Sequence, residues 1–418
     1  MAFLLRLVGA ALAFVYTSVI TRQIGVENSG YYFLSLAAVM FLSTVARAGL
    51  DNAVIRFAAV TADQKNWIGL KGIFCSIVGL VGILSFIIAV PVVVYAPEIS
   101  EHVWSNPAAS PILRFFAISI VSFSLMTILS EFLRAIGELT ASVLVSSILH
   151  TVAGIALLTT LFHGFDASGA ALTFLIATSF SAVMGALWWL RCINLQPMVG
   201  HRLSLSPILQ SSKHLFVIAL VGQAIIPFAP TILIGFWGTA EDAAIFSVAT
   251  RIGMIVGLML VAVNIVVAPR FAQLYEHRDL ERLEGFARSI SVFLAIVAAL
   301  IVGVGVMFSE PLMGVFGEDF RAGGNVLTVI LAGQFINVAT GSVGVLLMMT
   351  GLERQLKQLT ITSCGILIVL CFLLIPHIGG LGAAVAVAVS TAILNLSALY
   401  ITQLRLGIRV SPLPTFRK

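Results

Sequence analysis

The chain of 418 residues is 60% hydrophobic and 10% charged, with a mean hydropathy of +1.09 and a formal net charge of +5 at pH 7. Soluble domains contain about 25% charged residues, so this composition excludes a soluble globular protein and indicates an integral membrane protein. The positive charge is typical of cytoplasmic loops of membrane proteins. We therefore expect no separate soluble domain and no nucleic-acid partner.

Twelve apolar segments follow one another along the chain, each close to the roughly 20 residues with which an α-helix crosses a membrane. They span residues 3–23, 30–50, 70–96, 112–134, 139–162, 168–191, 213–236, 243–269, 286–309, 324–350, 355–376 and 380–404. The sequence predicts an all-α membrane protein with about 12 transmembrane helices.

The basic residues between these segments gather on one side of the membrane. With both termini inside, only Arg22, Arg114 and Arg321 of the 23 Lys and Arg residues fall outside, and Arg251 lies within a segment. Short loops rich in Lys and Arg stay in the cytoplasm. We therefore expect a multi-pass protein of the cytoplasmic (inner) membrane with both termini cytoplasmic.

An internal repeat with an offset of 213 to 214 residues relates the two halves. The matched pairs include Tyr32 and Phe246, Arg56 and Arg270, and Gly137 and Gly351. Each half holds six segments, so both halves enter the membrane from the same side. The sequence predicts two parallel six-helix lobes, residues 1–196 and 197–418, around a central cavity.

Arg251, in the eighth segment, is the one Arg or Lys that this assignment places on neither side of the membrane. It lies about nine residues after Asp242, roughly 14 Å along a helix, which places it in the outer half of the hydrocarbon core. A buried Arg costs about 2.5–3.5 kcal/mol to insert, so it should face a water-filled cavity or a partner. Its repeat equivalent is Ala37, which favours a role in the cavity over a structural one. The alternative is an Arg bonded to carbonyl groups of a neighbouring helix.

Uncharged polar residues within the segments are further candidate substrate contacts. Taken singly, each is more typical of hydrogen bonds between helices than of a ligand site. Gln223 is followed closely by Pro227 and Pro230. Because a proline leaves backbone carbonyl groups without their helical hydrogen bonds, the seventh segment is expected to bend. The candidates are Gln223, Asn264, Gln334 and Asn337.

Several kinds of chemistry have no signature in this sequence. There is no Walker A loop, HExxH or CxxC motif, and the four cysteines lie in or beside apolar runs. We therefore expect no enzyme activity, no metal and no cofactor. Ion-coupled drug exporters would be expected to carry acidic residues deep in the bilayer, whereas Asp51 and Glu131 lie near cytoplasmic helix ends. The predicted cavity is cationic.

Residues 25–59 carry a pattern that runs G-x-x-x-x-G-x-Y, then a long apolar stretch, then R-x-G-L-D-x-A-x-x-R. The matching residues are Gly25, Gly30, Tyr31, Arg47, Gly49, Leu50, Asp51, Ala53 and Arg56. This segment resembles the polysaccharide-biosynthesis flippases of the multidrug/oligosaccharidyl-lipid/polysaccharide exporter superfamily. The resemblance implies two six-helix lobes whose central cavity opens alternately to each side. It also assigns Arg47, Gly49, Asp51 and Arg56 to a gating motif at the cytoplasmic end.

The same resemblance implies a function, namely transfer of a polyprenyl-diphosphate-linked oligosaccharide across the membrane for surface polysaccharide synthesis. Arg251 suits the diphosphate, because a guanidinium stays charged and binds phosphate oxygens in a bidentate way. Arg6, Arg22 and Arg114 would extend the basic path near the two mouths. The implied partners are a lipid-linked glycan, membrane lipid, and polymerase and chain-length proteins.

Three other functions remain open from the sequence. An ion-coupled drug or metabolite antiporter of the same superfamily would share the architecture. A major-facilitator carrier also has parallel six-helix halves, but its basic G-x-x-x-D-R motif is missing from the loop after the second segment. A scaffold for a glycan assembly complex would keep its partners without transporting anything.

Overall fold

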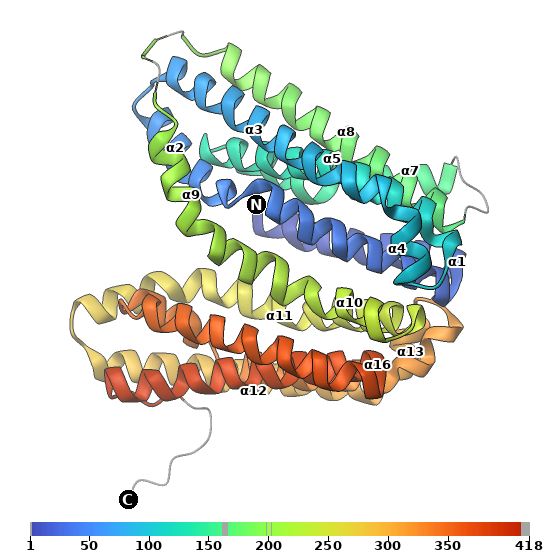
Figure 1. Cartoon of the computed structure of the whole chain (residues 1–418). Helices are drawn as coiled ribbons and strands as arrows, with labels where there is room; N and C mark the ends of the chain where they lie inside the picture. Colours follow the sequence, from blue (N-terminus) through green and yellow to red (C-terminus); the bar gives the residue numbers. More distant parts are fainter. Residues whose placement is uncertain (1, 161–165, 198, 202, 411–418) are drawn as a thin grey trace, which may run out of the picture. The chain divides into compact units, whose positions relative to one another are not determined.

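The computed structural model describes residues 2–160, 166–197, 199–201 and 203–410. Throughout these residues every regular element is helical (Figure 1). The prediction of an all-α protein is confirmed.

The chain divides into two compact units, Met1–Phe236 and Trp237–Lys418. In the first unit α5 packs against both α3 and α8 (Figure 1). Its elements are α1 (Ala2–Arg47), α2 (Leu50–Asp63), α3 (Trp67–Val94), α4 (Ala96–His102), η1 (Pro107–Ala109), α5 (Ser110–Ala135), α6 (Leu139–Val143), η2 (Leu144–Ile148), α7 (Leu149–Thr160), α8 (Ala167–Asn194), α9 (Ser206–Ala219), η3 (Leu220–Ile225) and α10 (Ile226–Trp237).

In the second unit α14 packs against α11, α12 and α16. The elements are α11 (Ala240–Glu276), α12 (Leu280–Met307), α13 (Ser309–Gly314), η4 (Glu318–Gly323), α14 (Gly324–Ala339), α15 (Val343–Met349) and α16 (Glu353–Leu406).

Among the described residues, ten helices are long and apolar enough to cross a membrane. Two of them, of 44 and 54 residues, are long enough for two crossings each. Both contain a break: Gly25 in α1 has φ 77° and ψ 173°, and Gly379 in α16 has φ 53° and ψ −133°. These breaks fall between segments that the sequence separates, but the number of twelve crossings stays a prediction.

The predicted tenth segment, 324–350, is not one continuous helix. It ends as α14 at Ala339 and resumes as α15 at Val343. Gly341 between them has φ 71°, and a Cβ there would collide with the Ser291 side chain of α12. The stretch from Ala339 to Ser342 is small and polar, so it lacks the side chains that hold a buried helix together.

The core of the first unit centres on three aromatic rings from three helices. Phe74 of α3 stacks on Trp189 of α8 at 4.6 Å between ring centroids, and Phe132 of α5 lies 5.1 Å and 5.3 Å from them. Phe132 and Trp189 are fully buried. In the second unit Phe271 of α11 is buried and packs edge-on against Phe286 of α12. Each unit therefore has its own side-chain core.

Two membrane helices contain a π-helical turn, η2 and η3. In η2 the carbonyl group of Val145 accepts a hydrogen bond of 2.6 Å from the Ser181 hydroxyl of α8. In η3 the turn directly precedes Pro227, whose ring would clash with the Gln223 carbonyl group in a regular α-helix. The seventh predicted segment thus has a π-helical turn just ahead of its prolines, where the sequence predicts a bend.

The polar connection after α8 is bound to the first unit. The Asn66 side chain accepts hydrogen bonds from the backbone N–H groups of Gly69 and His201, at 2.9 Å and 3.0 Å. The N–H of Ile68 donates to the carbonyl group of Val199 at 3.2 Å. Beyond this connection, α9 packs against α2.

This packing of α9 explains why the compact units divide after Phe236 and not at residue 196. The predicted lobes, 1–196 and 197–418, describe the duplication and stay a prediction. Local geometry agrees with a duplication at one pair of matched residues, since Gly137 and Gly351 both follow a helix end with positive φ, 88° and 75°.

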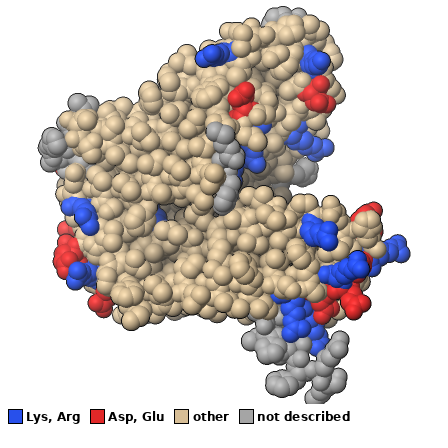
Figure 2. All heavy atoms as spheres, turned by 180° about the vertical axis from the view of Figure 1, so that it is seen from behind, with Lys and Arg blue, Asp and Glu red and all other residues tan. Residues whose placement is uncertain are grey.

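Charged side chains lie near the ends of the second unit. On the face seen in Figure 2 its middle shows a band of uncharged atoms between charged atoms at either end. Large apolar residues of α12, such as Phe293, Leu300 and Met307, are 56%, 67% and 78% exposed. Such a surface is suited to lipid and not to water.

Candidate functional site

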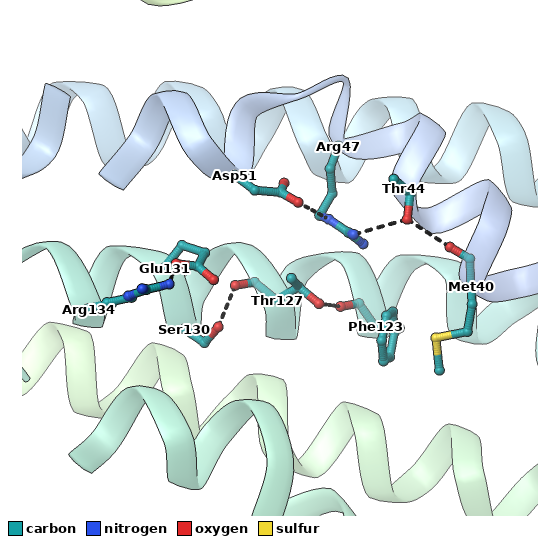
Figure 3. A network of polar contacts seen from close by, with 9 residues as sticks. All are labelled: Met40, Thr44, Arg47, Asp51, Phe123, Thr127, Ser130, Glu131 and Arg134. Atoms are coloured by element: carbon teal, nitrogen blue, oxygen red, sulfur yellow. Dashed lines mark hydrogen bonds and ion pairs between the residues drawn. The ribbon is translucent and has the colours of Figure 1, made fainter. Parts of the chain in front are cut away.

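Arg47 and Asp51 form a buried ion pair in the first unit (Figure 3). The Arg47 Nε donates to Asp51 Oδ2 at 2.9 Å, and Arg47 Nη2 donates to Thr44 Oγ1 at 3.2 Å. Arg47 is 4% and Asp51 is 6% exposed. Removing one member of such a pair leaves an uncompensated buried charge, which makes the pair strongly interdependent.

The short R-x-G-L-D sequence produces this pair through its backbone. Ala48 and Gly49 both have positive φ, 50° and 74°, and they end α1 and start α2. A Cβ on Gly49 would lie 2.6 Å from the backbone nitrogen of Phe216 and 2.7 Å from the carbonyl oxygen of Ser212 on α9. Only glycine meets both demands, the left-handed turn and the close approach of α9.

Arg56, the fourth residue of the predicted gating motif, lies apart from the other three. Its side chain is exposed, with its guanidinium carbon 5.7 Å from the centroid of the neighbouring Phe57 ring. The structure thus brings Arg47, Gly49 and Asp51 together and leaves Arg56 at the surface.

Glu131 of α5 faces the same region and was not among the predicted site residues. It projects into the space beside the Arg47–Asp51 pair (Figure 3). Glu131 Oε2 lies 3.5 Å from Arg134 Nη1, an ion-pair distance without a hydrogen bond. The sequence signal was present, since Glu131 is the acidic residue near the end of an otherwise apolar helix, but nothing in the sequence connects α5 to Asp51.

In the second unit the predicted residues Gln334 and Asn337 bond to each other. Asn337 Nδ2 donates to Gln334 Oε1 at 3.2 Å, and Asn395 Nδ2 of α16 donates to Asn337 Oδ1 at 3.2 Å. Gly253 and Gly257 of α11 lie against Gln334, at 3.5 Å from would-be Cβ atoms. Three amide side chains therefore link α14 to α16 beside a glycine face of α11.

Arg251 is half-buried on α11. Successive residues of an α-helix are rotated by about 100°, so Arg251 lies on another face than Gly253 and Gly257. Its own face includes Met254 and Ile255, which are 53% and 50% exposed in the structure. Along α11, Arg251 therefore points in another direction than the two glycines that lie against Gln334.

The other predicted substrate residues lie on several different helices. Arg6 and Arg22 on α1, Arg114 on α5 and Gln223 in η3 are exposed. Asn264 on α11 is half-buried, and its Oδ1 accepts no hydrogen bond from the described residues. Within the same part of the chain, no group of three His, Cys, Asp or Glu could hold a metal ion.

Comparison with known proteins gives a family match. A family described as "Polysaccharide biosynthesis protein" matches residues 1–275. The probable low-salt glycan biosynthesis flippase Agl15 of Haloferax volcanii is 23% identical over 397 residues, which cover 94% of this chain and 80% of the relative.

Solved structures with a similar fold include two kinds of transporter. A multidrug resistance MATE family transporter of the MOP superfamily, in an inward-facing conformation, has a TM-score of 0.75 at 14% identity, with 95% of this chain and 94% of that chain covered. The lipid II flippase MurJ, in an inward closed conformation, also has a TM-score of 0.75, at 15% identity and with 96% and 87% covered. The fold is that of MOP-superfamily transporters.

Proposed function

Because the chain belongs to the polysaccharide biosynthesis protein family, we propose that it is a flippase that moves a polyprenyl-diphosphate-linked oligosaccharide across the cytoplasmic membrane for surface polysaccharide synthesis. The observation that carries this proposal is the family match over residues 1–275, which includes the buried Arg47–Asp51 motif. The glycan biosynthesis flippase among the relatives supports the same substrate class. The role is transport without a chemical step, so no residue is assigned a catalytic part.

The proposed mechanism is alternating access between two lobes, 1–196 and 197–418, with a cavity between them. The parallel arrangement is supported by the six predicted segments in each half and by the matched loop geometry of the two halves. Both termini would face the cytoplasm of the inner membrane. Reporter fusions at the two ends test this orientation, and an external signal from either end contradicts it.

Arg251 is the proposed ligand of the diphosphate. It is the one Arg or Lys inside the apolar part of a predicted helix, and its guanidinium can bind phosphate oxygens at any physiological pH. Arg251 is half-buried in the predicted membrane segment, where a guanidinium is expected to face a polar cavity or a bound polar group. A diphosphate headgroup crossing the membrane is such a group.

The test compares export of surface polysaccharide by Arg251 variants. We expect Arg251→Ala and Arg251→Glu to reduce export strongly and Arg251→Lys to retain part of it, since Lys keeps the charge without the bidentate geometry. Arg270→Ala is the matched control, because Arg270 is an exposed Arg on the same helix. Wild-type export by all three variants at normal protein levels contradicts the diphosphate role.

The remaining predicted residues would contact the sugars and line the path. The amide side chains of Gln223, Asn264, Gln334 and Asn337 can donate to and accept from hydroxyl groups. Arg6, Arg22 and Arg114 would attract the anionic headgroup near the two mouths. Polymerase and chain-length proteins are the proposed partners, and co-purification from cells that make the glycan tests them.

An ion-coupled drug or metabolite antiporter is the second candidate function, favoured by the fold shared with a MATE transporter. Thermal protection distinguishes the two, because a ligand that binds only the folded protein raises its unfolding temperature. An anionic polyprenyl-diphosphate glycan should protect the flippase, whereas protection by organic cations alone would favour the antiporter.

A further inference from the structure

The three amide side chains of the second unit form a chain of hydrogen bonds that runs in one direction. Asn395 Nδ2 of α16 donates to Asn337 Oδ1 of α14, and Asn337 Nδ2 donates to Gln334 Oε1, each at 3.2 Å. Asn395 Nδ2 also donates to the Thr391 carbonyl group at 3.0 Å, which anchors the chain on α16. A side-chain amide carries its oxygen and its NH2 group on two different arms. With the Gln334 oxygen turned to Asn337, the Gln334 NH2 group forms the far end of the chain.

The NH2 group at this end is accessible and unbonded. Gln334 is half-buried, and its Nε2 atom neither bonds a described residue nor belongs to the fully buried atoms that lack a partner. Gln334 lies in the middle of the predicted tenth segment, 324–350, where lipid offers no acceptor for an amide N–H. An accessible donor at this depth is suited to water or a polar ligand and not to acyl chains.

Gly257 of α11 leaves this amide uncovered. A Cβ on Gly257 would lie 3.5 Å from Gln334 Oε1 and would have no other neighbour within 4 Å. Gly253, one turn earlier, differs, because a Cβ there would lie 2.6 Å from the Ile330 side chain. Gly253 thus allows α11 to pack closely on α14, whereas Gly257 keeps space open beside the Gln334 amide.

The amide chain is confined to the second half of the duplicated sequence. With the offset of 213 residues, none of its three members meets an amide at the matching position of the first half. The first half forms its helices without such a chain, which favours a ligand role over a packing role. The matching residues are Val121, Ser124 and Ala182.

The helices around the Gln334 amide carry few charges. α14 holds no charged residue, and α11 holds none between Arg251 and Arg270. α16 has no Asp, Glu, Lys or Arg between His377 and Arg405. Arg251 points away from the glycine face of α11, so a carboxylate bound to the amide would lack a nearby counter-charge, which is costly in an apolar environment. The group bound here should therefore be a neutral acceptor.

We propose that Gln334 donates through its NH2 group to the acetamido carbonyl oxygen of an N-acetylated sugar in the transported glycan. This inference rests on the flippase function proposed above and adds a chemical class to its substrate. An acetamido carbonyl is a neutral acceptor, whereas a sugar hydroxyl is also a donor, and the Gln334 oxygen is already engaged by Asn337. Asn337 and Asn395 are positioning residues, because they act by orienting Gln334.

Sugar binding to the purified full chain tests the proposal without transport. Saturation-transfer NMR measures the binding of three probes, namely N-acetylglucosamine, glucose and glucuronate. We expect wild type to prefer N-acetylglucosamine and Gln334→Leu to bind it about tenfold more weakly, the effect of one hydrogen bond. Gln403→Leu is the control, because Gln403 is an exposed glutamine of α16, and it should bind as wild type does. Equal binding of N-acetylglucosamine and glucose by wild type, or a preference for glucuronate, overturns the proposal.

Two further variants test the orientation of the amide. Asn337→Leu keeps the Gln334 amide but removes the bond that orients it, so the preference for N-acetylglucosamine should fall while glucose still binds. Gly257→Val leaves the hydrogen bonds in place and puts a side chain beside the amide, so N-acetylglucosamine binding should fall at an unchanged unfolding temperature. A wild-type preference in both variants overturns the proposal.

The two proposals fail separately. A wild-type sugar preference with export that does not depend on Arg251 contradicts the diphosphate role alone. Export that depends on Arg251, with no preference among the three sugars, overturns the acetamido site alone.

Discussion

Lys65 and Arg278 occupy the same position in two helix–loop–helix connections, although they lie 213 positions apart (278 − 65). Each directly follows a helix C-cap and has a left-handed backbone, with φ of 55° and 56°. The next residue in each loop, Asn66 or Asp279, caps the following helix with its side chain and donates a 3.1 Å backbone hydrogen bond to the preceding helix. Geometry that recurs at the predicted offset supports an internal duplication.

This pairing predicts that glycine stabilises both loops. A non-glycine residue with left-handed backbone costs about 1–2 kcal/mol, and glycine is the preferred residue after a helix C-cap. Lys65→Gly and Arg278→Gly should each raise the unfolding temperature of the purified protein by a similar amount. Gln64→Gly, one position earlier and right-handed, should not raise it. Destabilisation by either loop variant would contradict the shared geometry.

The buried ion pair predicts a large loss on removal of one partner. Asp51→Asn should destabilise the protein by about 3–5 kcal/mol, because Arg47 is then left without its carboxylate. Replacing both residues, Arg47→Met with Asp51→Leu, should recover much of that loss. Arg282→Gln is the control, since the side chain of Arg282 is 81% exposed and its pair with Asp279 should contribute under about 1 kcal/mol. Equal effects of Asp51→Asn and Arg282→Gln on thermal unfolding would show that the pair is unimportant.

Gly49 should tolerate no side chain. Gly49→Ala introduces both the left-handed backbone cost and a collision with the α9 backbone, which together should exceed about 2 kcal/mol. Gly137→Ala isolates the first cost, since Gly137 has φ 88° and open space where a Cβ would lie. The difference between the two variants in unfolding temperature measures the contact of α9 with Gly49. If the two variants are equally stable, that contact is absent.

Asp242 joins the start of α11 to the break in α16. Its carboxylate accepts hydrogen bonds from the Thr239 backbone and hydroxyl at 3.1 Å and 2.9 Å and from the Gly380 N–H at 2.9 Å. Asp242→Ala should therefore cost about 2–4 kcal/mol. Asp279→Ala removes a helix cap and an exposed ion pair with Arg282, and should cost about 1 kcal/mol. If Asp242→Ala lost no more stability than Asp279→Ala, the hydrogen bond from Gly380 to Asp242 would not contribute to stability.

Much of the fold was predictable because a membrane restricts what a chain can do. Backbone polar groups must be satisfied inside the bilayer, so long apolar runs are helices, and Gly25 and Gly379 fall where the sequence separates two segments. The spacing of Gln334 and Asn337, three residues apart on α14, is that of side-chain pairs on a helix surface. Such a pair can be inferred from sequence alone, whereas the Arg47–Asp51 pair depends on the left-handed backbone of Ala48 and Gly49 between two helices.

Contacts between distant segments could not be predicted in this way. The approach of Glu131 to Asp51 depends on how α5 packs against α2, and the hydrogen bond from Gly380 to Asp242 spans 138 positions. The break at Gly341 has a weak signal in the sequence, namely a short stretch of small and polar residues inside an apolar run. Many continuous membrane helices contain a similar stretch, so this signal does not predict a break. The place of Arg251 relative to a substrate likewise depends on tertiary geometry and not on spacing.

Two hydrogen bonds fix the polar connection after α8: His201 N–H donates to the Asn66 side chain, and Ile68 N–H donates to the Val199 carbonyl group. The polar composition alone would suggest a flexible linker. Val199 and His201 are nevertheless hydrogen-bonded to the α2–α3 connection, and Ser212 and Phe216 of α9 pack against Gly49. The chain is therefore attached to the first unit both ahead of α9, at Val199 and His201, and within it. The next irregular backbone downstream is the π-helical turn η3, which precedes Pro227 inside the apolar part of the seventh predicted segment.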